Sequence, residues 1–458
     1  MSNVIWTSAN IAKVTGGEML GEWNVSGISI DSRTAKAGDL FVPLKDARDG
    51  HDFIPMARDA GVGGVLSERE TQAPAVIVKD SLAALTALGQ AGCARSTALR
   101  IGVTGSVGKT SVKDALFHLF SKFGTTHKSL ASYNNHWGVP LTMARMPEAS
   151  QYGVFELGMN HAGEMSALST LLKPDVALIT TVAGAHLAHF ENIEAIARAK
   201  AEIIDGLSPD GVLILNADND YTDLIKSIAS EAGIRAENIL TFGHADDNDV
   251  AIVDVRKHPL VTNIRLRIDG QQIDVTLPLI GDHWVSNTAA IMAVAKAAGL
   301  NLRKSAMRLR TLQPTAGRGK THTLSIGGKA FILIDESYNA NPASMRAAID
   351  VLSMHEGRKL AVLGDMFELG ADELKLHAAL AEPLEAANAA RVFVTGECMR
   401  ALRGALPQPM RAAWSQNWEQ AKTALLSELE EGDVVLLKGS NATGLGRLAT
   451  ALISEGSV

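Results

Sequence analysis

The sequence lacks the features that mark secreted, membrane-spanning and repetitive proteins. Only two of its 458 residues are cysteines, Cys93 and Cys398, which is too few for a disulfide framework or a thiolate metal cluster and predicts a reducing compartment. No apolar run reaches the ~18 residues that cross a bilayer, and no charged segment followed by an apolar stretch opens the chain. Internal repeats of about 20 to 50 residues and low-complexity tracts are missing as well. These absences predict a cytoplasmic protein with no stable membrane insertion.

An excess of positive charge is also missing. Lysine and arginine total 43 against 50 aspartate and glutamate residues, which gives a formal net charge of −7. This balance argues against a protein that coats nucleic acid or binds membranes through a polybasic surface, but it leaves room for local basic pockets that hold phosphates. Hydrophobic residues make up 46% of the chain and charged residues 20%, which is typical of globular proteins and excludes a disordered or fibrous chain.

The pattern of apolar runs predicts an α/β protein with three domains, in line with about 150 residues per domain. Residues 1–97 carry short strand-like runs between polar turns and end in a helical run. Residues 98–314 open with an apolar strand, and their later apolar runs alternate with helical patterns, as buried parallel strands do. Residues 313–319 combine proline with glycine and predict a linker. Residues 315–458 alternate strands with helices, among them a predicted helix over 372–389, and indicate a second, smaller doubly wound sheet.

The strongest local signal is a glycine-rich turn between a predicted strand and a predicted helix. It reads Thr104-Gly105-Ser106-Val107-Gly108-Lys109-Thr110-Ser111. Glycines let backbone N–H groups turn inward, the helix N-terminus adds positive potential, and Lys109 can reach terminal phosphates. The hydroxyl of Thr110 is placed for a Mg²⁺ ion shared with the nucleotide. The first glycine of the general G-x4-G-K-[ST] pattern is replaced by Val103, but the shorter T-G-x-x-G-K-T form is present.

This turn predicts a nucleoside triphosphate site, and the alternative is a glycine-rich turn with a solvated lysine. The predicted ATP-binding residues of the turn are Gly105, Ser106, Val107, Gly108, Lys109, Thr110 and Ser111. The motif alone specifies only a nucleotide, so other residues must indicate the reaction.

Three residues outside the turn carry groups that suit phosphate and metal chemistry. Glu156 ends the apolar run 152–157, where a carboxylate at the carboxyl edge of a sheet can hold a metal ion. His186 follows the apolar run that ends at Thr181, and Lys200 lies in a helical pattern. Taken alone, each has an ordinary reading: a solvated glutamate, a structural histidine and a solvated lysine.

In order and spacing, these segments resemble the Mur ligases, the ATP-dependent amide-bond-forming enzymes of peptidoglycan precursor synthesis. The segments are 104–111, 156–158, 185–187 and 199–203. In that family the glutamate and histidine positions bind Mg²⁺ and the lysine is carbamoylated. The resemblance therefore implies that Thr110, Glu156, His186 and the carbamate of Lys200 hold Mg²⁺, and that Lys109, Glu156, His186 and Lys200 are catalytic. The chemistry is coherent, because Mg²⁺ repels an ammonium but binds an anionic carbamate oxygen.

Segments at the N-terminus and after residue 130 indicate which substrate the resemblance implies. Residues 31–33, 38–44 and 49–53 look like the uridine-nucleotide-binding domain of the later Mur ligases. Residues 132–135 and 138–142 are similar to the Asn-Asn signature of the branch that adds D-alanyl-D-alanine. The implied contacts to the UDP substrate are Ser32, Arg33, Asp49, Gly50, His51, Asn134 and Asn135. Without the resemblance these stretches are ordinary strand and turn sequence.

The last third of the chain looks closely like the same branch, in residues 335–345 and 362–370. The Asp-Asn-Pro-Arg motif of the diamino-acid-adding ligase is not found. The resemblance implies that Tyr338, Asn339 and Asn341 bind the incoming dipeptide; the alternative for this stretch is a turn before a helix N-terminus. It further implies that Asn287 contacts adenine, that Arg318 clamps phosphate when the third domain closes, and that Asp335 orients the ribose or the linker. For Arg318 the alternative is a solvated hinge arginine.

Four positions depart from the family pattern. Trp284 stands where Asn is usual, Thr181 where Asn is frequent, Glu336 where a second Asp is frequent, and Asn441 where Arg is common. None is in the phosphate loop or among the implied metal ligands. They leave individual contacts to adenine and to the dipeptide open.

The resemblance implies a three-domain fold with a small uridine-nucleotide-binding domain (1–97), a central P-loop ATPase domain with a mostly parallel sheet (98–314) and a C-terminal Rossmann-like domain (315–458). It implies a monomeric ligase, with ATP and Mg²⁺, that joins D-alanyl-D-alanine to a UDP-N-acetylmuramoyl-tripeptide through an acyl phosphate. The third residue of the tripeptide, meso-diaminopimelate or lysine, stays open. Another Mur or folylpolyglutamate-type ligase is the nearest alternative, and a P-loop switch that hydrolyses nucleotide is a more distant one.

Overall fold

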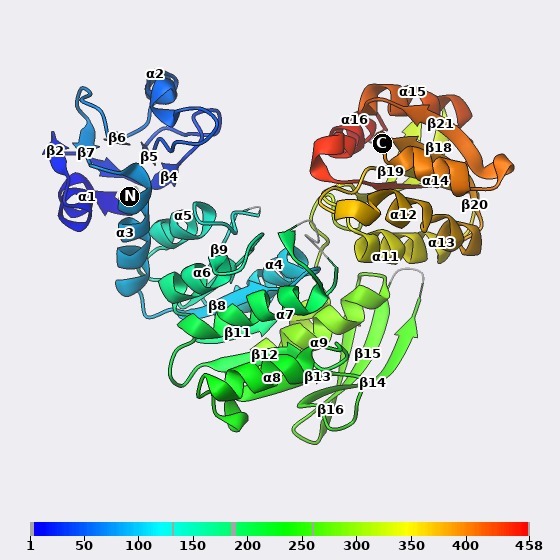
Figure 1. Ribbon diagram of the computed structural model, residues 1–458, viewed down its shortest axis with the longest axis horizontal. Helices are drawn as coiled ribbons and strands as arrows, with labels where there is room; N and C mark the ends of the chain where they lie inside the picture. The colour runs from blue at the N-terminus through cyan, green and yellow to red at the C-terminus, as the bar shows by residue number, and fades with distance from the viewer. Residues whose placement is uncertain (1–3, 131, 185–188, 259–260, 457–458) are drawn as a thin grey trace.

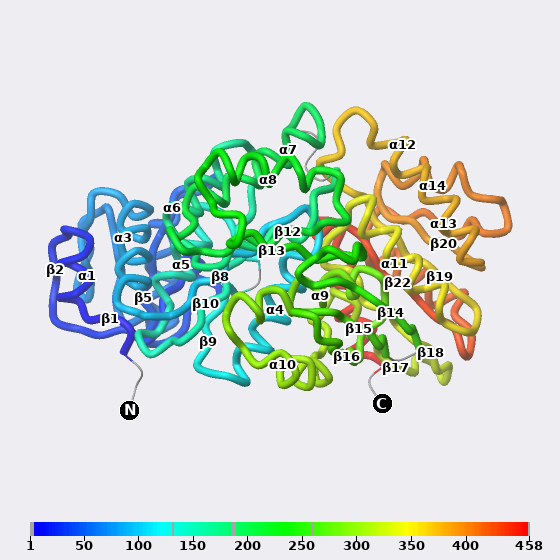
Figure 2. The backbone as a smooth tube through the Cα atoms, turned by 90° about the horizontal axis from the view of Figure 1, so that it is seen from below, coloured from blue at the N-terminus to red at the C-terminus, as the bar shows by residue number. Residues whose placement is uncertain are grey.

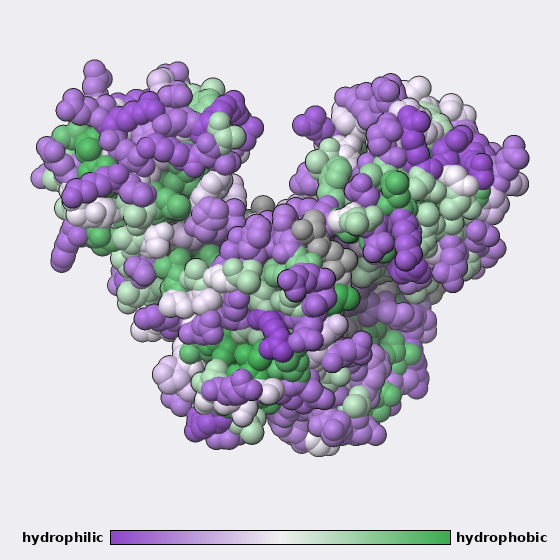
Figure 3. Space-filling model, viewed as in Figure 1, coloured by the Kyte–Doolittle hydropathy of each residue, from purple (hydrophilic) through white to green (hydrophobic). Residues whose placement is uncertain are grey.

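Two outer lobes stand apart on a larger central lobe (Figure 1). The computed structural model describes residues 4–130, 132–184, 189–258 and 261–456. The N-terminal lobe and the C-terminal lobe lie at opposite ends of the molecule when it is turned by 90° (Figure 2). An open space separates the facing surfaces of the outer lobes, and hydrophilic residues form much of its visible floor (Figure 3). Within the described chain, no helix combines the length and apolarity needed to cross a bilayer.

The N-terminal lobe is built on a five-stranded sheet of order β2-β7-β6-β5-β4, in which only the β2–β7 pair is antiparallel. Its strands are β2 (Glu18–Leu20), β4 (Gly27–Ser29), β5 (Asp39–Phe41), β6 (Gly64–Ser67) and β7 (Ala75–Ile77), and β1 (Trp6–Thr7) pairs with β3 (Asn24–Val25) beside them. Its helices are α1 (Ser8–Thr15), α2 (Ile54–Asp59) and α3 (Ser81–Ala94). Helix α3 begins after Asp80, whose side chain accepts a hydrogen bond from the Ala83 N–H and so caps the helix.

Close helix packing fixes this lobe to the central one. A Cβ atom on Gly92 of α3 would lie 2.4 Å from the Met143 carbonyl oxygen of α5 (Gly138–Arg145), so only glycine allows this approach. The Arg95 guanidinium donates to the Ile5 and Met146 carbonyls and so ties both lobes together. The joint is therefore continuous packing and hydrogen bonding, not a free linker.

The central lobe contains a nine-stranded sheet of order β16-β15-β14-β13-β12-β11-β8-β10-β9, parallel from β9 to β14 and antiparallel at β14, β15 and β16. Its strands are β8 (Leu99–Thr104), β9 (Thr126–Lys128), β10 (Tyr152–Glu156), β11 (Val176–Ile179), β12 (Val212–Asn216), β13 (Ile239–Gly243), β14 (Val250–Lys257), β15 (Thr262–Ile268) and β16 (Gln271–Leu277). Its helices are α4 (Lys109–Phe120), α5 (Gly138–Arg145), α6 (Glu164–Leu172), α7 (Ile193–Ala201), α8 (Thr222–Glu231), α9 (Asp282–Ala297) and α10 (Leu302–Leu309). All parallel strands end at one edge, where ligands bind in open α/β sheets.

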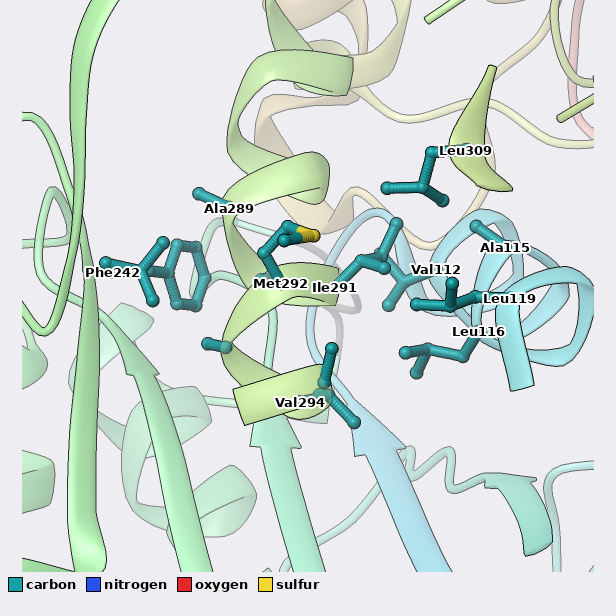
Figure 4. Close-up of a cluster of buried hydrophobic side chains, with 14 of the residues drawn as sticks. Val112, Ala115, Leu116, Leu119, Phe242, Ala289, Ile291, Met292, Val294 and Leu309 are labelled. Atoms are coloured by element: carbon teal, nitrogen blue, oxygen red, sulfur yellow. The ribbon is translucent and has the colours of Figure 1, made fainter. Parts of the chain in front are cut away.

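A continuous apolar core holds the phosphate-loop helix in place. Helix α9 lies between Phe242 of β13 and helix α4 (Figure 4). Ile291 of α9 and Val112 and Leu116 of α4 are fully buried in this cluster. Because each such side chain stabilises the fold by about 1.5–3 kcal/mol, the position of α4 relative to the sheet is strongly fixed.

The C-terminal lobe contains a six-stranded sheet of order β17-β18-β22-β19-β20-β21, parallel except for β17. Its strands are β17 (Lys320–Ile326), β18 (Lys329–Glu336), β19 (Lys359–Gly364), β20 (Ala389–Thr395), β21 (Arg411–Ser415) and β22 (Val434–Lys438). Its helices are α11 (Pro342–Ser353), α12 (Glu373–Ala378), α13 (Ala381–Ala386), α14 (Met399–Ala405), α15 (Trp418–Glu428) and α16 (Leu445–Gly456). The helix predicted over 372–389 is wrong as one element, because Pro383 lacks the N–H that a continuous helix needs and lies in the first turn of a new helix.

The predicted α/β class with mostly parallel sheets is confirmed. The three larger sheets use strands within residues 18–77, 99–277 and 320–438. The domain boundaries at 97/98 and 314/315 stay predictions.

Candidate active site

The glycine-rich turn connects β8 to the N-terminus of α4, as predicted. Gly105 and Gly108 have φ angles of 146° and 88°, which favour glycine. A Cβ atom on Gly105 would lie 2.0 Å from Thr180 Oγ1, so the turn has no space for a side chain there. No side chain caps α4, which leaves its first N–H groups available to an anion. The Lys109 ammonium donates to the Gly105 carbonyl at 2.6 Å and so lies folded over the turn.

A cavity of about 590 Å³ lies between this turn and the C-terminal lobe. Of the predicted site residues, Ser106, Val107, Gly108, Lys109, Thr110, Ser111, Asn134, Glu156, Asn287, Arg318, Tyr338, Asn339 and Asn341 line it. Residues from the start of α4, the end of β10, the linker and the segment after β18 therefore converge on one space, although more than 200 positions separate Thr110 from Tyr338.

The Glu156 carboxylate is the centre of a buried hydrogen-bond cluster. Its side chain is 1% exposed and accepts from the Thr110 hydroxyl at 2.8 Å and from the Asn134 amide at 2.8 Å. The Arg318 guanidinium donates to the Thr110 oxygen at 3.0 Å. Two oxygen ligands for a hard cation, a hydroxyl and a carboxylate, thus lie side by side at the mouth of the phosphate loop.

Lys113 is a buried cation that the sequence analysis did not select. Its Nζ lies 3.8 Å from Glu156 Oε2 and 3.4 Å from Asp114 Oδ1. Burial lowers the pKa of Lys113, and the Asp114 and Glu156 carboxylates oppose that shift. Asp114 also accepts a hydrogen bond from the Thr315 hydroxyl at 2.9 Å, which joins α4 to the linker. In the sequence, Lys113 could have been found from its position four residues after Lys109, which places both lysines on the same side of α4.

Lys200 lies on α7 and is 2% exposed. Burial lowers its pKa well below the ordinary lysine value, and the nearby Lys109 charge lowers it further. Within the described residues its amine has no hydrogen-bond or ion-pair partner. A neutral amine is the form that attacks carbon dioxide, so this environment favours carbamate formation. The predicted ligand His186 lies outside the described residues.

One ring contact and three hydrogen bonds hold the linker and the segment after β18 at the cavity. The Arg318 guanidinium stacks on the Tyr338 ring at 4.1 Å from its centre, and the Tyr338 hydroxyl donates to Ser132 Oγ at 2.7 Å. The Asp335 carboxylate accepts from the Gly317 N–H at 2.8 Å and from the Ser337 hydroxyl at 2.5 Å. The structure thus gives Asp335 a role in holding the linker, whereas its predicted contact to ATP stays a prediction.

The segment after β18 presents amide and charged groups to the cavity. Asn341 caps α11 by accepting from the Ser344 N–H, so the turn-and-cap alternative describes its local role. The Lys438 ammonium, at the end of β22, donates to the Asn339 carbonyl at 2.9 Å and is 3% exposed. Burial lowers the pKa of Lys438, with the Glu336 carboxylate opposing.

Two polar atoms on one face of α9 have no partner among the described residues. Asn287 Nδ2 and His283 Nδ1 are both buried and without a hydrogen bond, and both residues line the cavity. Burial lowers the pKa of His283, which favours its neutral form. An unpaired buried polar atom is costly, so these atoms indicate a ligand with complementary groups. His283 was not selected from the sequence, although its spacing of four residues from Asn287 places both on the same face.

Three family models match the chain in order. Residues 24–93 match the catalytic domain of the Mur ligase family, residues 103–295 the Mur ligase middle domain, and residues 323–441 the Mur ligase glutamate ligase domain. A curated UDP-N-acetylmuramoyl-tripeptide–D-alanyl-D-alanine ligase from Rickettsia prowazekii is 31% identical over 97% of this chain and 99% of that protein. The Escherichia coli protein with that name is 32% identical over 98% of this chain and 99% of its own. The chain belongs to the Mur ligase family.

Solved structures agree with this membership. A crystal structure of MurF from Acinetobacter baumannii superimposes with a TM-score of 0.86 at 30% identity and covers 98% of this chain and 99% of its own. MurF ligase from Thermotoga maritima in complex with ADP gives a TM-score of 0.77 at 26% identity, with 94% and 97% covered. This Mur ligase is therefore an ATP-dependent amide-bond-forming enzyme with the predicted three-domain fold.

Two of the residues predicted to contact the UDP substrate, His51 and Gly50, make contacts within the N-terminal lobe of this Mur ligase. His51 is buried, its Nδ1 lies 2.6 Å from Asp49 Oδ1, and its Nε2 accepts the Glu68 N–H at 3.1 Å. Both ring nitrogens are therefore used inside the lobe. Gly50 has no space for a Cβ atom, which would lie 2.5 Å from the Leu44 carbonyl oxygen. These contacts shape a loop, and direct contact with UDP stays a prediction.

Ser32 and Arg33 follow β4, whose Ile28 carbonyl accepts a hydrogen bond from Arg145 of the central lobe. Arg33 is exposed and pairs with Asp31, which raises the pKa of Arg33, and the Tyr133 side chain is close enough to add to this shift. Ser32 is mostly buried and donates to the Met56 sulfur. In the turn before α5, Asn135 Oδ1 accepts from the Trp137 N–H at 3.2 Å and from the Gly138 N–H at 2.9 Å.

The four departures from the family pattern have different surroundings. Trp284 is 4% exposed and packs in the apolar core, so it does not line the cavity. Thr181 lines the cavity, and its hydroxyl accepts from the Asn219 amide. Glu336 and Asn441 both line the cavity as well. The departures that can affect ligand contacts are therefore Thr181, Glu336 and Asn441.

Proposed function

We propose that this Mur ligase joins D-alanyl-D-alanine to a UDP-N-acetylmuramoyl-tripeptide, with hydrolysis of ATP to ADP and phosphate. The observation that carries the proposal is the convergence of the phosphate loop, Glu156 and the Tyr338–Asn341 segment on one cavity. The curated relatives that match nearly the whole chain bear this activity in their names. The third residue of the tripeptide stays open, and the monomeric state and cytoplasmic location stay predictions.

The donor set fits a magnesium ion. Thr110 and Glu156 supply hard oxygen donors in direct contact with each other, and a carbamate on Lys200 would supply a third. When bound, Mg²⁺ neutralises negative charge that builds between a phosphate and a carboxylate. A carbamate would also place a negative charge near the Lys109 ammonium, whose charge disfavours a second ammonium at Lys200.

The protein side chains would make the tripeptide carboxylate reactive in two steps. A carboxylate has no good leaving group, so its oxygen first attacks the γ-phosphorus of ATP, and ADP leaves. Lys109, folded over the turn, and Arg318, donating at its mouth, would stabilise the charge of the transferring phosphoryl group. The dipeptide amine then attacks the acyl carbon, and phosphate leaves with the oxygen of the former carboxylate.

The linker contacts would serve to exclude water. Thr315 of the linker bonds to Asp114, and Tyr338 after β18 bonds to Ser132, so both segments meet the central lobe. An acyl phosphate hydrolyses if water reaches it, and closure of the C-terminal lobe would protect it.

Phosphate release in the presence of ATP, Mg²⁺ and UDP-N-acetylmuramoyl-tripeptide tests the proposal. Release should depend on D-alanyl-D-alanine and should not be supported by a diamino acid or by glutamate. A rate of phosphate release that does not depend on the dipeptide would favour a P-loop switch. Phosphate release that depends on another amino acid would favour a different ligase of the family.

A further inference from the structure

We propose that Glu336 is the carboxylate that binds the ammonium group of the incoming dipeptide and takes a proton from it. The proposal rests on the proposed ligase function. An α-amino group has a pKa of about 8, so near neutral pH it arrives mostly as an ammonium, which has no lone pair for attack. The cavity must therefore contain a group that attracts this cation and then accepts its proton.

Two carboxylates line the cavity among the described residues, Glu156 and Glu336. Both oxygens of Glu156 accept hydrogen bonds, from Thr110 and Asn134, and Lys113 lies beside it. Glu156 is thus fully engaged at the phosphate loop, and a proton on it would break these contacts.

Glu336 has free acceptor capacity. Its side chain is 16% exposed, and its titratable neighbours include the Lys438 ammonium, 3.6 Å from Oε2, and the His283 ring of α9. Its one ion pair within the described residues is with Lys438. A carboxylate facing a cavity with an unused oxygen is suited to bind an ammonium ion.

The sheet fixes where this carboxylate points. Glu336 ends β18 and Lys438 ends β22, and the two are register partners in adjacent parallel strands. Lys438 is anchored in turn on the Asn339 carbonyl at 2.9 Å. Glu336 therefore lies at the carboxyl edge of the C-terminal sheet and lines the same cavity as Lys109 and Thr110.

The step balances without any further reactant. One proton moves from the ammonium nitrogen to a Glu336 oxygen, which leaves a neutral amine and a carboxylic acid. The amine lone pair forms the C–N bond to the acyl carbon, and the C–O bond to phosphate breaks. The departing phosphate takes the second proton of the nitrogen, and Glu336 returns its proton to solvent.

Hydroxylamine separates this role from a role in the phosphoryl step, because it is mostly uncharged near neutral pH and needs no proton acceptor before attack. In Glu336→Gln, kcat/KM for D-alanyl-D-alanine should fall about 100-fold or more. Hydroxamate formation from tripeptide, ATP and hydroxylamine should change less than about threefold. In the variant, kcat/KM for D-alanyl-D-alanine should rise about tenfold per pH unit as pH increases toward about 8, because more of the amine is then uncharged. In the wild type, kcat/KM should change less with pH.

Glu382→Gln is the matched control, because Glu382 is 85% exposed on α13 and outside the cavity. It should leave both reactions unchanged. Glu336→Asp keeps the charge and should retain more dipeptide activity than Glu336→Gln. An equal loss of both reactions in Glu336→Gln, or unchanged dipeptide kinetics, would overturn the inference. Failure of the wild-type protein to form any hydroxamate would instead overturn the proposed acyl phosphate, and this inference with it.

Discussion

Replacing Lys200 with methionine tests a buried lysine that lies near Lys109 of the phosphate loop. The bare lysine is buried, has no partner among the described residues and lies near Lys109. An unpaired buried polar group costs about 1–3 kcal/mol. Methionine fills a similar volume without that cost, so Lys200→Met should stabilise the central lobe by about this amount in buffer free of carbon dioxide. For a lobe of about 200 residues this corresponds to a rise of roughly 2–10 °C in its thermal transition.

Bicarbonate should raise the thermal transition of the wild type relative to that of Lys200→Met. Carbon dioxide that reacts with Lys200 only in the folded state stabilises that state by mass action, by about 2.7 kcal/mol at 100 times its dissociation constant. The wild-type transition should therefore rise with bicarbonate, while that of Lys200→Met stays constant, so the gap narrows or reverses. The variant should lose ligase activity by about 100-fold or more in either buffer, because it cannot supply the anionic oxygen.

Differential scanning calorimetry with and without bicarbonate, together with ADP release, measures both effects. Lys304→Met is the control, since Lys304 is exposed on α10. In protein equilibrated with ¹³C-bicarbonate, a carbamate resonance should be present in wild type and absent in Lys200→Met. A transition that does not respond to bicarbonate, combined with full activity of the variant, would refute the reasoning.

Other substitutions have effects whose direction follows from the structure. Arg318→Met removes the donor to Thr110 and should lower kcat/KM for ATP about 100-fold without changing the thermal transition; an unchanged value would assign Arg318 to the solvated-hinge alternative. Burial lowers the pKa of His127 to about 4, so the unfolded state takes its proton first, and wild type should lose about 3 kcal/mol of stability as pH falls from 6.5 to about 4. In His127→Gln that loss should be absent from urea unfolding curves, and equal pH profiles would contradict it. Asn341→Ala removes the cap of α11 and should cost about 1 kcal/mol of stability; no change in the urea midpoint would show that the cap is dispensable.

Local sequence patterns predict those parts of the site in which neighbours in sequence are neighbours in space. The phosphate loop is of this kind, because a strand, a glycine turn and a helix determine its geometry. Glu156 is of this kind too, since the end of a buried parallel strand places it at the ligand-binding edge. Asn287 was indicated by the resemblance, and its unpaired amide at the cavity supports the choice.

Pairings between distant strands could not be predicted in the same way. Glu336 and Lys438 become partners only through the register of β18 with β22, which no local pattern specifies. The Asp114 contact to Thr315 spans 201 positions. For His51 the family pattern predicts a substrate contact, which stays a prediction; the fold adds that its ring nitrogens contact Asp49 and Glu68, which the pattern did not indicate.

The transfer of an oxygen atom from the tripeptide carboxylate to the released phosphate tests the acyl phosphate mechanism most directly. UDP-N-acetylmuramoyl-tripeptide labelled with ¹⁸O in its terminal carboxylate is incubated with ATP, Mg²⁺ and D-alanyl-D-alanine, and the released phosphate is analysed by mass spectrometry. An acyl phosphate intermediate requires that one ¹⁸O atom passes to phosphate for each amide bond formed. Phosphate without the label, at a rate equal to amide formation, would contradict the mechanism and with it the proposed activation of the tripeptide in this cavity.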